Sequence, residues 1–513
     1  MRRVVFAILL SAATGAWADT PSSIDVSDLW WNPSESGWGL NLAQQGDTAF
    51  ATLFVYGSDG LAHWYSASSL RRGGSGASLV FSGTLQESTG PAQPGTFDAS
   101  KVVRRDVGSM QLVTSGDNAA QLTYSVNGVT VQKSVQRLTT KAANASGEYV
   151  GFRSATGCGT GTDPLSNNAA SLRVLQSPSQ FTLTSTVLNE TCTYVGTPDQ
   201  RGRITGVKGT FSCSGQTPPG QFEITSMNVT YQGFVAHLTT RTSASCSMDA
   251  RFAGLSPEGT VAARASADSS DLWWNPDESG WGINFQQQDD IAFATLFTYD
   301  ANGQPKWYSA SDLRVRFVLP GGLASLDGNL YESIGPGITT SFNPAMVSRR
   351  AVGLFTATPA PGVPDELNLL YTIDGVQYVK HVKRLTTSGD NPSGTYRGDY
   401  AMRNTCSGGG TGIFSEPATF TINVNGAFQM TAVTANQNCT FVGSNEPHGR
   451  MFFSRGTYVC TGNLPETGNY RISELEVGQD GMIGQIMRGT DPPDNLPFAN
   501  CVTGGRFAGV RPF

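Results

Sequence analysis

The chain has few of the residues on which catalytic and metal sites most often depend. Histidine occurs four times in 513 residues, and charged residues make up 14% of the sequence. The motifs GxSxG, HExxH and the phosphate-binding P-loop do not occur, and CxxC pairs, which would indicate a zinc site, are absent as well. No basic stripe indicates a nucleic-acid-binding surface. The sequence therefore predicts no metal, no cofactor and no nucleic-acid partner.

Long apolar runs are also missing after the first residues of the chain, although a bilayer span takes about 20 such residues. Residues 1–18 contain Arg2 and Arg3, a short apolar run and the small-x-small site Ala16-Trp17-Ala18. This pattern is typical of a cleaved signal peptide. We therefore expect a secreted protein, periplasmic or extracellular, with no transmembrane segment once the signal is removed.

What the sequence does contain is a long internal repeat. The segments Ser27–Leu70 and Ser270–Leu313 share 30 identities in 44 positions. Weaker matches extend the repeat over the whole chain and divide it into two kinds of unit in the order A-B-A-B. We place unit A1 at residues 19–141, unit B1 at 142–258, unit A2 at 259–388 and unit B2 at 389–513.

Short β-rich runs and tight turns fill every unit. In A1 the turn-forming pairs Gly46-Asp47 and Asn127-Gly128 separate runs of Val, Thr and aromatic residues. About seven or eight strands fit into each unit by this reasoning. A meander of that length closes most readily as an up-and-down barrel or a compact sandwich. We therefore predict an all-β protein of tandem small antiparallel meander β-barrels or sandwiches.

Cysteine occurs only in the B units, four residues in each. Even numbers, similar spacing and an export signal favour disulfides. Four cysteines allow three pairings. We expect the inner pairs, Cys192–Cys213 and Cys439–Cys460, which leaves Cys158–Cys246 and Cys406–Cys501 to join the first strand of each B unit to its last.

Tryptophan has the opposite distribution, because the eight tryptophans after the signal divide equally between A1 and A2. Adjacent side chains of an extended strand point to opposite faces, so one residue of the pair Trp30-Trp31 is expected to point inward and the other to be exposed. The aromatic residues either fill a barrel core or line a site together with retained Asn and Gln. On the second interpretation the predicted ligand-binding residues are Trp30, Trp31, Trp38, Asn41, Gln45, Trp64, Tyr65, Trp273, Trp274, Trp281, Asn284, Gln288, Trp307 and Tyr308.

Our leading expectation is an exported, non-catalytic binding protein whose A units hold a glycan or a cell-envelope component. One alternative is a secreted hydrolase that uses paired carboxylates, since both A copies retain Glu35/Glu278 and Glu87/Glu332. The other alternative is a structural or adhesive surface protein. No histidine is matched by a histidine in the other half, so no catalytic residue is assigned.

The run Leu29-Trp30-Trp31-Asn32-Pro33-x-Glu-Ser-Gly37-Trp38-Gly39, followed by Gln44-Gln45 and Trp64-Tyr65, resembles a WWNPxESGWG repeat of uncharacterised secreted proteins of proteobacteria. The resemblance covers the A units and implies a location outside the cytoplasm, without implying an activity. In architecture, the meander loosely resembles avidin-like and lipocalin-like barrels.

Overall fold

The structure is a computed structural model. It describes residues 25–73, 78–92, 97–157, 167–215, 217–242, 246–257, 268–318, 324–337, 341–360, 363–405, 411–489 and 502–513. The predicted signal peptide, residues 1–18, lies outside the described residues.

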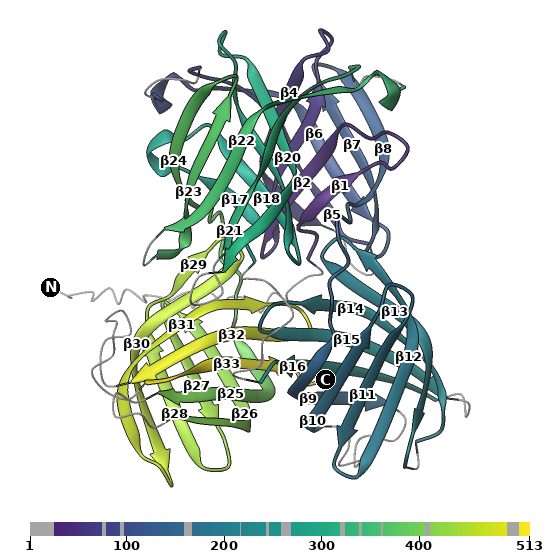
Figure 1. The fold of residues 1–513 in the computed structure, drawn as a ribbon, viewed down its shortest axis with the longest axis vertical. Coiled ribbons are helices and arrows are strands. Elements are labelled where there is room, and N and C mark those ends of the chain that lie inside the picture. The colour runs from purple at the N-terminus through teal and green to yellow at the C-terminus, as the bar shows by residue number, and fades with distance from the viewer. Residues whose placement is uncertain are drawn as a thin grey trace, which may run out of the picture.

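Four closed antiparallel barrels make up the protein, one in each unit (Figure 1). Three have eight strands, and the fourth has the same plan with one strand divided in two. This confirms the predicted all-β fold of tandem small meander barrels. In three of the barrels each strand pairs with the next one along the chain, and in B2 the two parts of one divided strand both pair with the strand that follows them. The first strand of every barrel pairs with its last. Closure removes the unpaired edges that a small sheet would otherwise expose to other chains.

The two A barrels have matching strands. In A1 these are β1 (Asp28–Trp31), β2 (Gly39–Gln45), β3 (Thr48–Tyr56), β4 (Ala62–Gly73), β5 (Val80–Thr89), β6 (Val103–Thr114), β7 (Ala119–Val126) and β8 (Val129–Arg137). In A2 they are β17 (Asp271–Trp274), β18 (Gly282–Gln288), β19 (Ile291–Tyr299), β20 (Pro305–Val318), β21 (Ala324–Ile334), β22 (Ser348–Ala360), β23 (Val363–Ile373) and β24 (Val376–Arg384).

The B barrels differ from each other in one strand, because the counterpart of β12 is divided into β28 and β29 in B2. B1 contains β9 (Gly147–Gly157), β10 (Asn167–Gln176), β11 (Phe181–Val187), β12 (Glu190–Arg201), β13 (Ile204–Cys213), β14 (Gly220–Val229), β15 (Gly233–Thr242) and β16 (Ser247–Leu255). B2 contains β25 (Gly394–Thr405), β26 (Thr411–Asn425), β27 (Ala427–Val433), β28 (Gln437–Gly443), β29 (Glu446–His448), β30 (Met451–Gly462), β31 (Glu466–Val477), β32 (Gly481–Gly489) and β33 (Val502–Val510).

Helical structure in the described residues is limited to short 3-10 turns in loops of the A barrels, namely η1 (Ala99–Lys101), η3 (Pro276–Glu278) and η4 (Pro344–Met346). No helix among the residues that the structure describes has the length and apolar character needed to cross a membrane.

Tight turns explain why each strand folds back onto the one before it. Asn127 and Gly128, between β7 and β8, have φ angles of 49° and 86°. Asp374 and Gly375 repeat this between β23 and β24, with φ angles of 48° and 84°. Two successive positive φ angles are the hairpin conformation that Asn-Gly and Asp-Gly favour, as the sequence predicts for Asn127-Gly128.

Strands β2 and β18 are buried along their whole length, unlike most strands of the protein. In β11, by contrast, buried and half-buried residues alternate, as expected where only one face of a strand lies in a core. One face of β2, with Leu40 and Leu42, lies in the apolar core. The other face of this strand position reaches the second A barrel, since Asn284 of β18, which matches Asn41, places its Nδ2 3.5 Å from Oγ1 of Thr52 in A1. The A barrels thus share one continuous apolar core.

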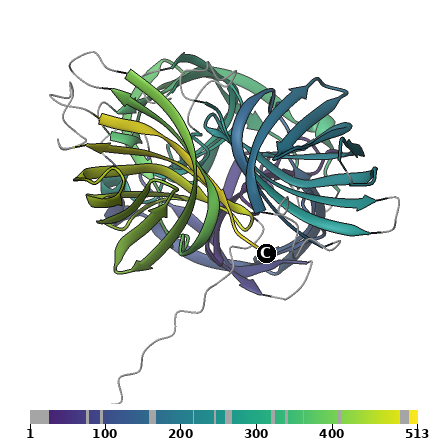
Figure 2. The same ribbon diagram turned by 90° about the horizontal axis from the view of Figure 1, so that it is seen from below.

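The barrels are arranged as two side-by-side pairs. The A barrels form one end of the molecule and the B barrels form the other, with B1 beneath A1 and B2 beneath A2 (Figure 1). A view from below shows B1 and B2 next to each other (Figure 2). A small apolar cluster that includes Phe152, Ala253, Ile483 and Ala508 joins the two B barrels.

The structure confirms the two inner disulfides. Cys192 bonds to Cys213 and Cys439 bonds to Cys460, each between directly opposite residues of neighbouring strands. Cys246 is disulfide-bonded as well. The other predicted cysteines, Cys158, Cys406 and Cys501, lie outside the described residues. Disulfides are consistent with a compartment outside the reducing cytoplasm.

Candidate functional site

The predicted ligand-binding residues of the A units lie inside the protein. None of the fourteen side chains is exposed: Trp31, Tyr65 and Trp274 are half-buried, and the other eleven are buried. Trp30 points into the barrel, as expected for one member of the tryptophan pair. Trp31 lies where β1 pairs with β8 to close the barrel, and it is half-buried instead of exposed.

Trp30 and Trp38 are held by hydrogen bonds within A1. The Trp30 Nε1 donates to the carbonyl oxygen of Val26 at 3.0 Å, and the guanidinium of Arg137 lies 4.9 Å from the centre of the Trp30 ring. The Trp38 Nε1 donates to Oε2 of Glu35 at 3.1 Å. The same bonds recur in A2, from Trp273 to Ser269 and from Trp281 to Glu278.

Trp64 and Trp307 lie in the contact between the two A barrels. The Trp64 Nε1 donates to the carbonyl oxygen of Thr298 in A2, and the Trp307 Nε1 donates to that of Val55 in A1, both at 2.9 Å. Trp64 also packs on Phe297, with ring centres 5.1 Å apart. The best-retained segment of the repeat therefore supplies Trp64 on β4 and Trp307 on β20, the two strands through which the A barrels chiefly contact each other.

Gln45 and Gln288 tie each A barrel to the other half of the chain. The Gln45 Nε2 donates to the carbonyl oxygen of Leu385 at 2.7 Å, and its Oε1 accepts from the backbone of Thr387 and Ser388. These residues form the linker from A2 to B2. Gln288 makes the matching bonds to the linker from A1 to B1, residues 138–141. The packing and hydrogen bonds just described give the retained Trp and Gln side chains a structural role, and their ligand role stays a prediction.

The retained carboxylates of A1 form ion pairs with basic side chains of the same barrel. Glu35 accepts a hydrogen bond from Nζ of Lys133 at 2.8 Å, and Glu87 lies 2.7 Å from an Arg105 nitrogen and 3.0 Å from Nε2 of His63. In A2, Lys380 pairs with Glu278, and Lys306 and Arg350 pair with Glu332. The two carboxylates of each A barrel thus pair with different cations, and their use in hydrolysis stays a prediction.

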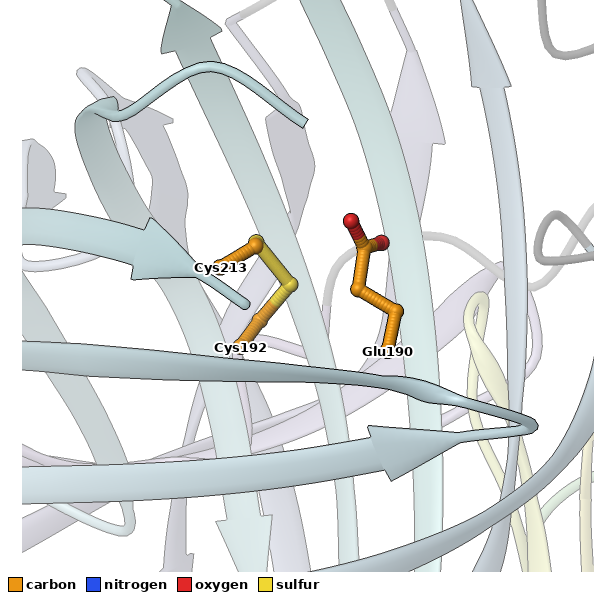
Figure 3. A group of neighbouring side chains, drawn as sticks. All are labelled: Glu190, Cys192 and Cys213. Carbon is orange, nitrogen blue, oxygen red and sulfur yellow. A yellow bond between two sulfur atoms is a disulfide. The ribbon is translucent and has the colours of Figure 1, made fainter. Parts of the chain in front are cut away.

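One group of potential metal ligands occurs among the described residues, formed by Glu190, Cys192 and Cys213 (Figure 3). Figure 3 shows the Glu190 carboxylate beside the disulfide. A cysteine binds zinc as a free thiolate, and both sulfurs are consumed by their bond to each other. With the disulfide formed, this group offers a metal one carboxylate only. The carboxylate instead accepts hydrogen bonds from Thr217.

A cavity of about 340 Å³ lies where A1, B1 and B2 meet the linker from A2 to B2. We call it the junction cavity. Charged side chains on its wall come from every one of these parts, and Ile204, Val235, Val477 and Ile483 make an apolar portion. The acidic side chains of the wall are Asp25, Asp117, Asp390, Glu476 and Asp480, and the basic ones are Arg137, Arg203 and Arg450.

A buried ion cluster lies beside the junction cavity and joins the four barrels. Arg203 of B1 contacts Asp25 at 3.4 Å, Asp268 at 3.6 Å and Glu476 at 3.1 Å. Arg450 of B2 pairs with Asp268 and with Glu476. Burial opposes ionisation of Asp268, but Arg450 and Arg203 outweigh it and lower its pKa to about 2. Asp268 is therefore ionised near neutral pH, and the contacts of the cluster fix the position of one cavity wall.

The same place in the other half holds a much smaller pocket of about 50 Å³, which we call the counterpart pocket. Tyr231 lines it and donates a hydrogen bond through its hydroxyl to the buried Glu474 at 2.5 Å. Burial is the main reason why the pKa of Tyr231 and the pKa of Glu474 are both raised. The residue matching Tyr231 in B2 is Gln479, which lines the junction cavity.

Other exchanges between the halves change these two sites further. Asp289 of the counterpart pocket is matched by Gly46, and Thr230 is matched by Gly478. Each exchange puts a smaller residue at the junction cavity. The exchange of Ala143 for Asp390 is the reverse, because it puts a larger residue at the junction cavity. The Oδ1 of Asp390 accepts a hydrogen bond from the backbone N–H of Gly46. The two halves therefore build one open and one filled version of the same junction.

The sequence-based search did not find the junction cavity, because that search rests on residues that both halves retain and the cavity differs between them. The available signal is the pair of charge changes at Ala143/Asp390 and Lys141/Ser388 in otherwise similar linkers. A scan against protein-family models found no match, and a search of curated proteins found no match either.

Proposed function

We propose that the protein is an exported, non-catalytic binding protein and that it takes up a small ligand in the junction cavity. The observation that carries this proposal is the contrast between a cavity of about 340 Å³ in one half and a pocket of about 50 Å³ at the matching place in the other. Small-molecule sites usually measure roughly 300–1,000 Å³ and occur preferentially between domains.

The composition of the wall supports binding. Ligand sites combine apolar surface with a few fixed polar groups, and here Ile204, Val235 and Ile483 lie near the buried ion cluster. Because Arg203 and Arg450 are tied to carboxylates of three different barrels, the polar groups are already in place before a ligand arrives. Such preorganisation lowers the entropic cost of binding. A glycan or a cell-envelope component remains the proposed source of the ligand.

Filling the cavity tests the proposal. The variant Gln479→Tyr copies the residue that occupies the counterpart pocket, and Gln180→Tyr makes the same exchange at an exposed turn of B1. Small envelope-derived compounds are screened for thermal stabilisation of the full chain and by native mass spectrometry. We expect compounds that bind the wild type and Gln180→Tyr and that no longer bind Gln479→Tyr. Binding that Gln479→Tyr leaves unchanged contradicts the proposal, as does the absence of any binding compound.

A second candidate function, self-association at a surface, is favoured by one observation. Leu354, Leu370 and Val379 are 64%, 45% and 70% exposed on the outer face of A2, and Leu370 pairs directly with Val379. The matching residues of A1 are the polar Ser109, Thr123 and Gln132. Contiguous exposed apolar side chains mark association surfaces more often than isolated ones do.

The A1 residues supply the test of this second candidate. Light scattering of the full chain is compared with that of the triple variant Leu354→Ser, Leu370→Thr and Val379→Gln over a range of protein concentrations. Self-association through this face predicts a concentration-dependent increase in mass for the wild type that the variant lacks. A wild type that remains monomeric over the whole range argues against it.

A further inference from the structure

We propose that the junction cavity selects small organic cations, and that the ammonium group of the ligand pairs with the carboxylate of Asp390. The inference rests on the proposed function, because it names the chemical class that this cavity accepts. Three observations carry it, namely the charge balance of the wall, the cation that stands at the matching place in the other half, and the surroundings of Asp390.

The guanidinium groups of the wall are already neutralised by protein carboxylates. Arg203 contacts Asp25 and Glu476, and Arg450 contacts Glu476 at 3.0 Å. Arg137, the third, is bound to the buried Asp28 at 3.1 Å. An anionic ligand would have to displace these contacts and would also meet the remaining carboxylates. The wall therefore disfavours an anion.

Asp390 differs from the other carboxylates of the cavity in its ion pairing. Asp480 contacts Nε of Arg251 at 3.2 Å and Asp117 lies 3.8 Å from Arg201. Among the residues that the structure describes, no Lys or Arg nitrogen lies within ion-pair distance of Asp390. Its one hydrogen bond in the described structure comes from the backbone N–H of Gly46, and a carboxylate can accept several. A bound ammonium group supplies the missing donors and charge.

The other half of the chain shows which group meets a carboxylate at the equivalent contact. There the linker residue Lys141 places Nζ 2.9 Å from Oδ2 of Asp289, and it also pairs with Asp290. The residue matching Lys141 is Ser388, and the residue matching Asp289 is Gly46. Thus the linker from A1 to B1 brings an ammonium group to an acidic loop. The linker from A2 to B2 brings an acid and no ammonium group.

The surroundings of Asp390 make the cation preference depend on pH. Burial raises the pKa of Asp390 to about 7; Asp25 and Glu476 act in the same direction, whereas the Gly46 N–H and Arg450 oppose them. The carboxylate is the form that pairs with an ammonium group. Affinity for the cation is therefore expected to increase as the pH rises through about 7 and to level off above it.

Two series of matched probes test the inference on the full chain. Glucamine, sorbitol and gluconate share a sugar-alcohol chain, and pentylamine, pentanol and pentanoate share an alkyl chain. Each series contains a cation, a neutral compound and an anion, and the two series distinguish a sugar from an aliphatic ligand body. Calorimetry at pH 8 is expected to show binding of the ammonium member of one series about ten-fold tighter than that of its neutral analogue, as for a charge-assisted hydrogen bond.

Three variants locate the effect. Asp390→Asn is expected to remove the ten-fold preference and its pH dependence, while the neutral analogue binds as before. Ser388→Lys supplies the ammonium group that Lys141 supplies in the other half, and it is expected to weaken binding of the cation. The matched control is Asp47→Asn, which removes a more exposed carboxylate next to Gly46 and is expected to leave the preference unchanged.

The outcomes separate this inference from the proposed function. Binding of cation, neutral compound and anion with equal affinity, or a preference that persists in Asp390→Asn, overturns the cation inference and leaves the cavity as a binding site. No binding of either series, together with no other compound sensitive to Gln479→Tyr, overturns both. A preference lost in Asp47→Asn as well as in Asp390→Asn shows a general charge effect and overturns the assignment to Asp390.

Discussion

The two A barrels meet through nearly identical surfaces, whereas the two B barrels meet through surfaces that have diverged. Across the A contact, Trp64 and Trp307 make the same hydrogen bond in opposite directions. Across the B contact, Ser226 of B1 donates a hydrogen bond to Asp480 of B2. In the reciprocal contact Glu474 stands for Ser226 and Gln232 for Asp480, and here Gln232 is the donor and Glu474 the acceptor. Since each copy of a self-complementary contact has to fit the other, change is restricted in the A pair. The B pair has accumulated differences, such as Gln479 in place of Tyr231, that contribute to the opening of the junction cavity.

The largest expected effect is the loss of a tryptophan from the A contact. Trp64→Ala and Trp307→Ala each remove a buried aromatic ring and a hydrogen bond to the other barrel. Each is expected to lower the free energy of unfolding by about 3–5 kcal/mol, as for other buried aromatic residues. Urea denaturation followed by circular dichroism measures the change. The exposed Val129→Ala in A1 serves as control, with an expected change within about 0.5 kcal/mol.

If only one of the two tryptophan variants is destabilised, the A contact is less symmetric than the reciprocal hydrogen bonds indicate. Equal losses support the comparison between the A and B pairs. A loss below about 1 kcal/mol in both variants contradicts the packing role of these residues and renews the case for a ligand role.

A second prediction concerns Asp399 at the B contact. Asp399 is 4% exposed, its Oδ2 has no hydrogen-bond partner among the residues that the structure describes, and burial raises its pKa to about 7. Its match in B1 is Phe152, which belongs to the apolar cluster between the B barrels. A raised pKa means that the carboxyl stabilises the fold below its unfolded-state pKa of 3.8 and that this stability is lost as the pH rises to about 7.

Asp399→Asn removes that titration. Relative to the wild type, the variant is expected to gain stability between pH 4 and pH 7, reaching a few kcal/mol and at most about 4 kcal/mol above pH 7. Thermal unfolding of both proteins at pH 4.5, 6 and 8 measures the trend. A difference that does not depend on pH would show that Asp399 has an ordinary pKa and that the B contact is more hydrated than its burial indicates.

The smallest expected effect is a difference between the two disulfides. The sulfurs of Cys192 and Cys213 lie within 4.8 Å of the Glu190 carboxylate. Those of Cys439 and Cys460 lie 3.4 Å and 3.5 Å from Nη1 of Arg488. The two residues matching Glu190 and Arg488 are Gln437 and Thr240, so the charge beside the disulfide differs between the B barrels.

A cation stabilises a thiolate and a nearby anion destabilises it, so the disulfide of B2 is expected to be reduced before that of B1. A difference of about 30 mV, or about 1.4 kcal/mol, is the expected size. Alkylation and mass spectrometry in graded glutathione buffers follow each pair, and Arg488→Gln is expected to bring the two midpoints together. Reduction of the B1 pair first would contradict the role of these charges.

The fold was largely predictable because strand and turn signals are local. The hairpin at Asn127-Gly128 and the cross-strand pairs Cys192–Cys213 and Cys439–Cys460 follow from residues near one another in the sequence. The contact between the A barrels was not predictable in this way. Trp64 packs against residues more than 200 positions away, and a strand with two apolar faces does not reveal whether its second face meets a ligand, a partner or another barrel.

The junction cavity was beyond the same reasoning for a different reason. Residues shared by the two halves direct attention to Trp30, Trp38 and Trp64, which are buried. The cavity depends on Gly46, Asp390 and Gln479, which differ from their matches. Their effect depends on how four separate barrels are placed around one point, and no local pattern in the chain specifies that placement.

The crossed hydrogen bonds of Gln45 and Gln288 have a consequence for how the molecule is held together. Each glutamine forms hydrogen bonds with the linker of the opposite half. Trp64 and Trp307 also donate hydrogen bonds to backbone carbonyls of the opposite half. The peptide connection between Ser256 and Asp268 is therefore one of several connections between the halves. When the chain is divided within that segment and the two polypeptides are produced separately, we expect them to associate into the four-barrel structure without a covalent bond. The protein can then serve as a split-protein system in which association of the two halves is the measured signal.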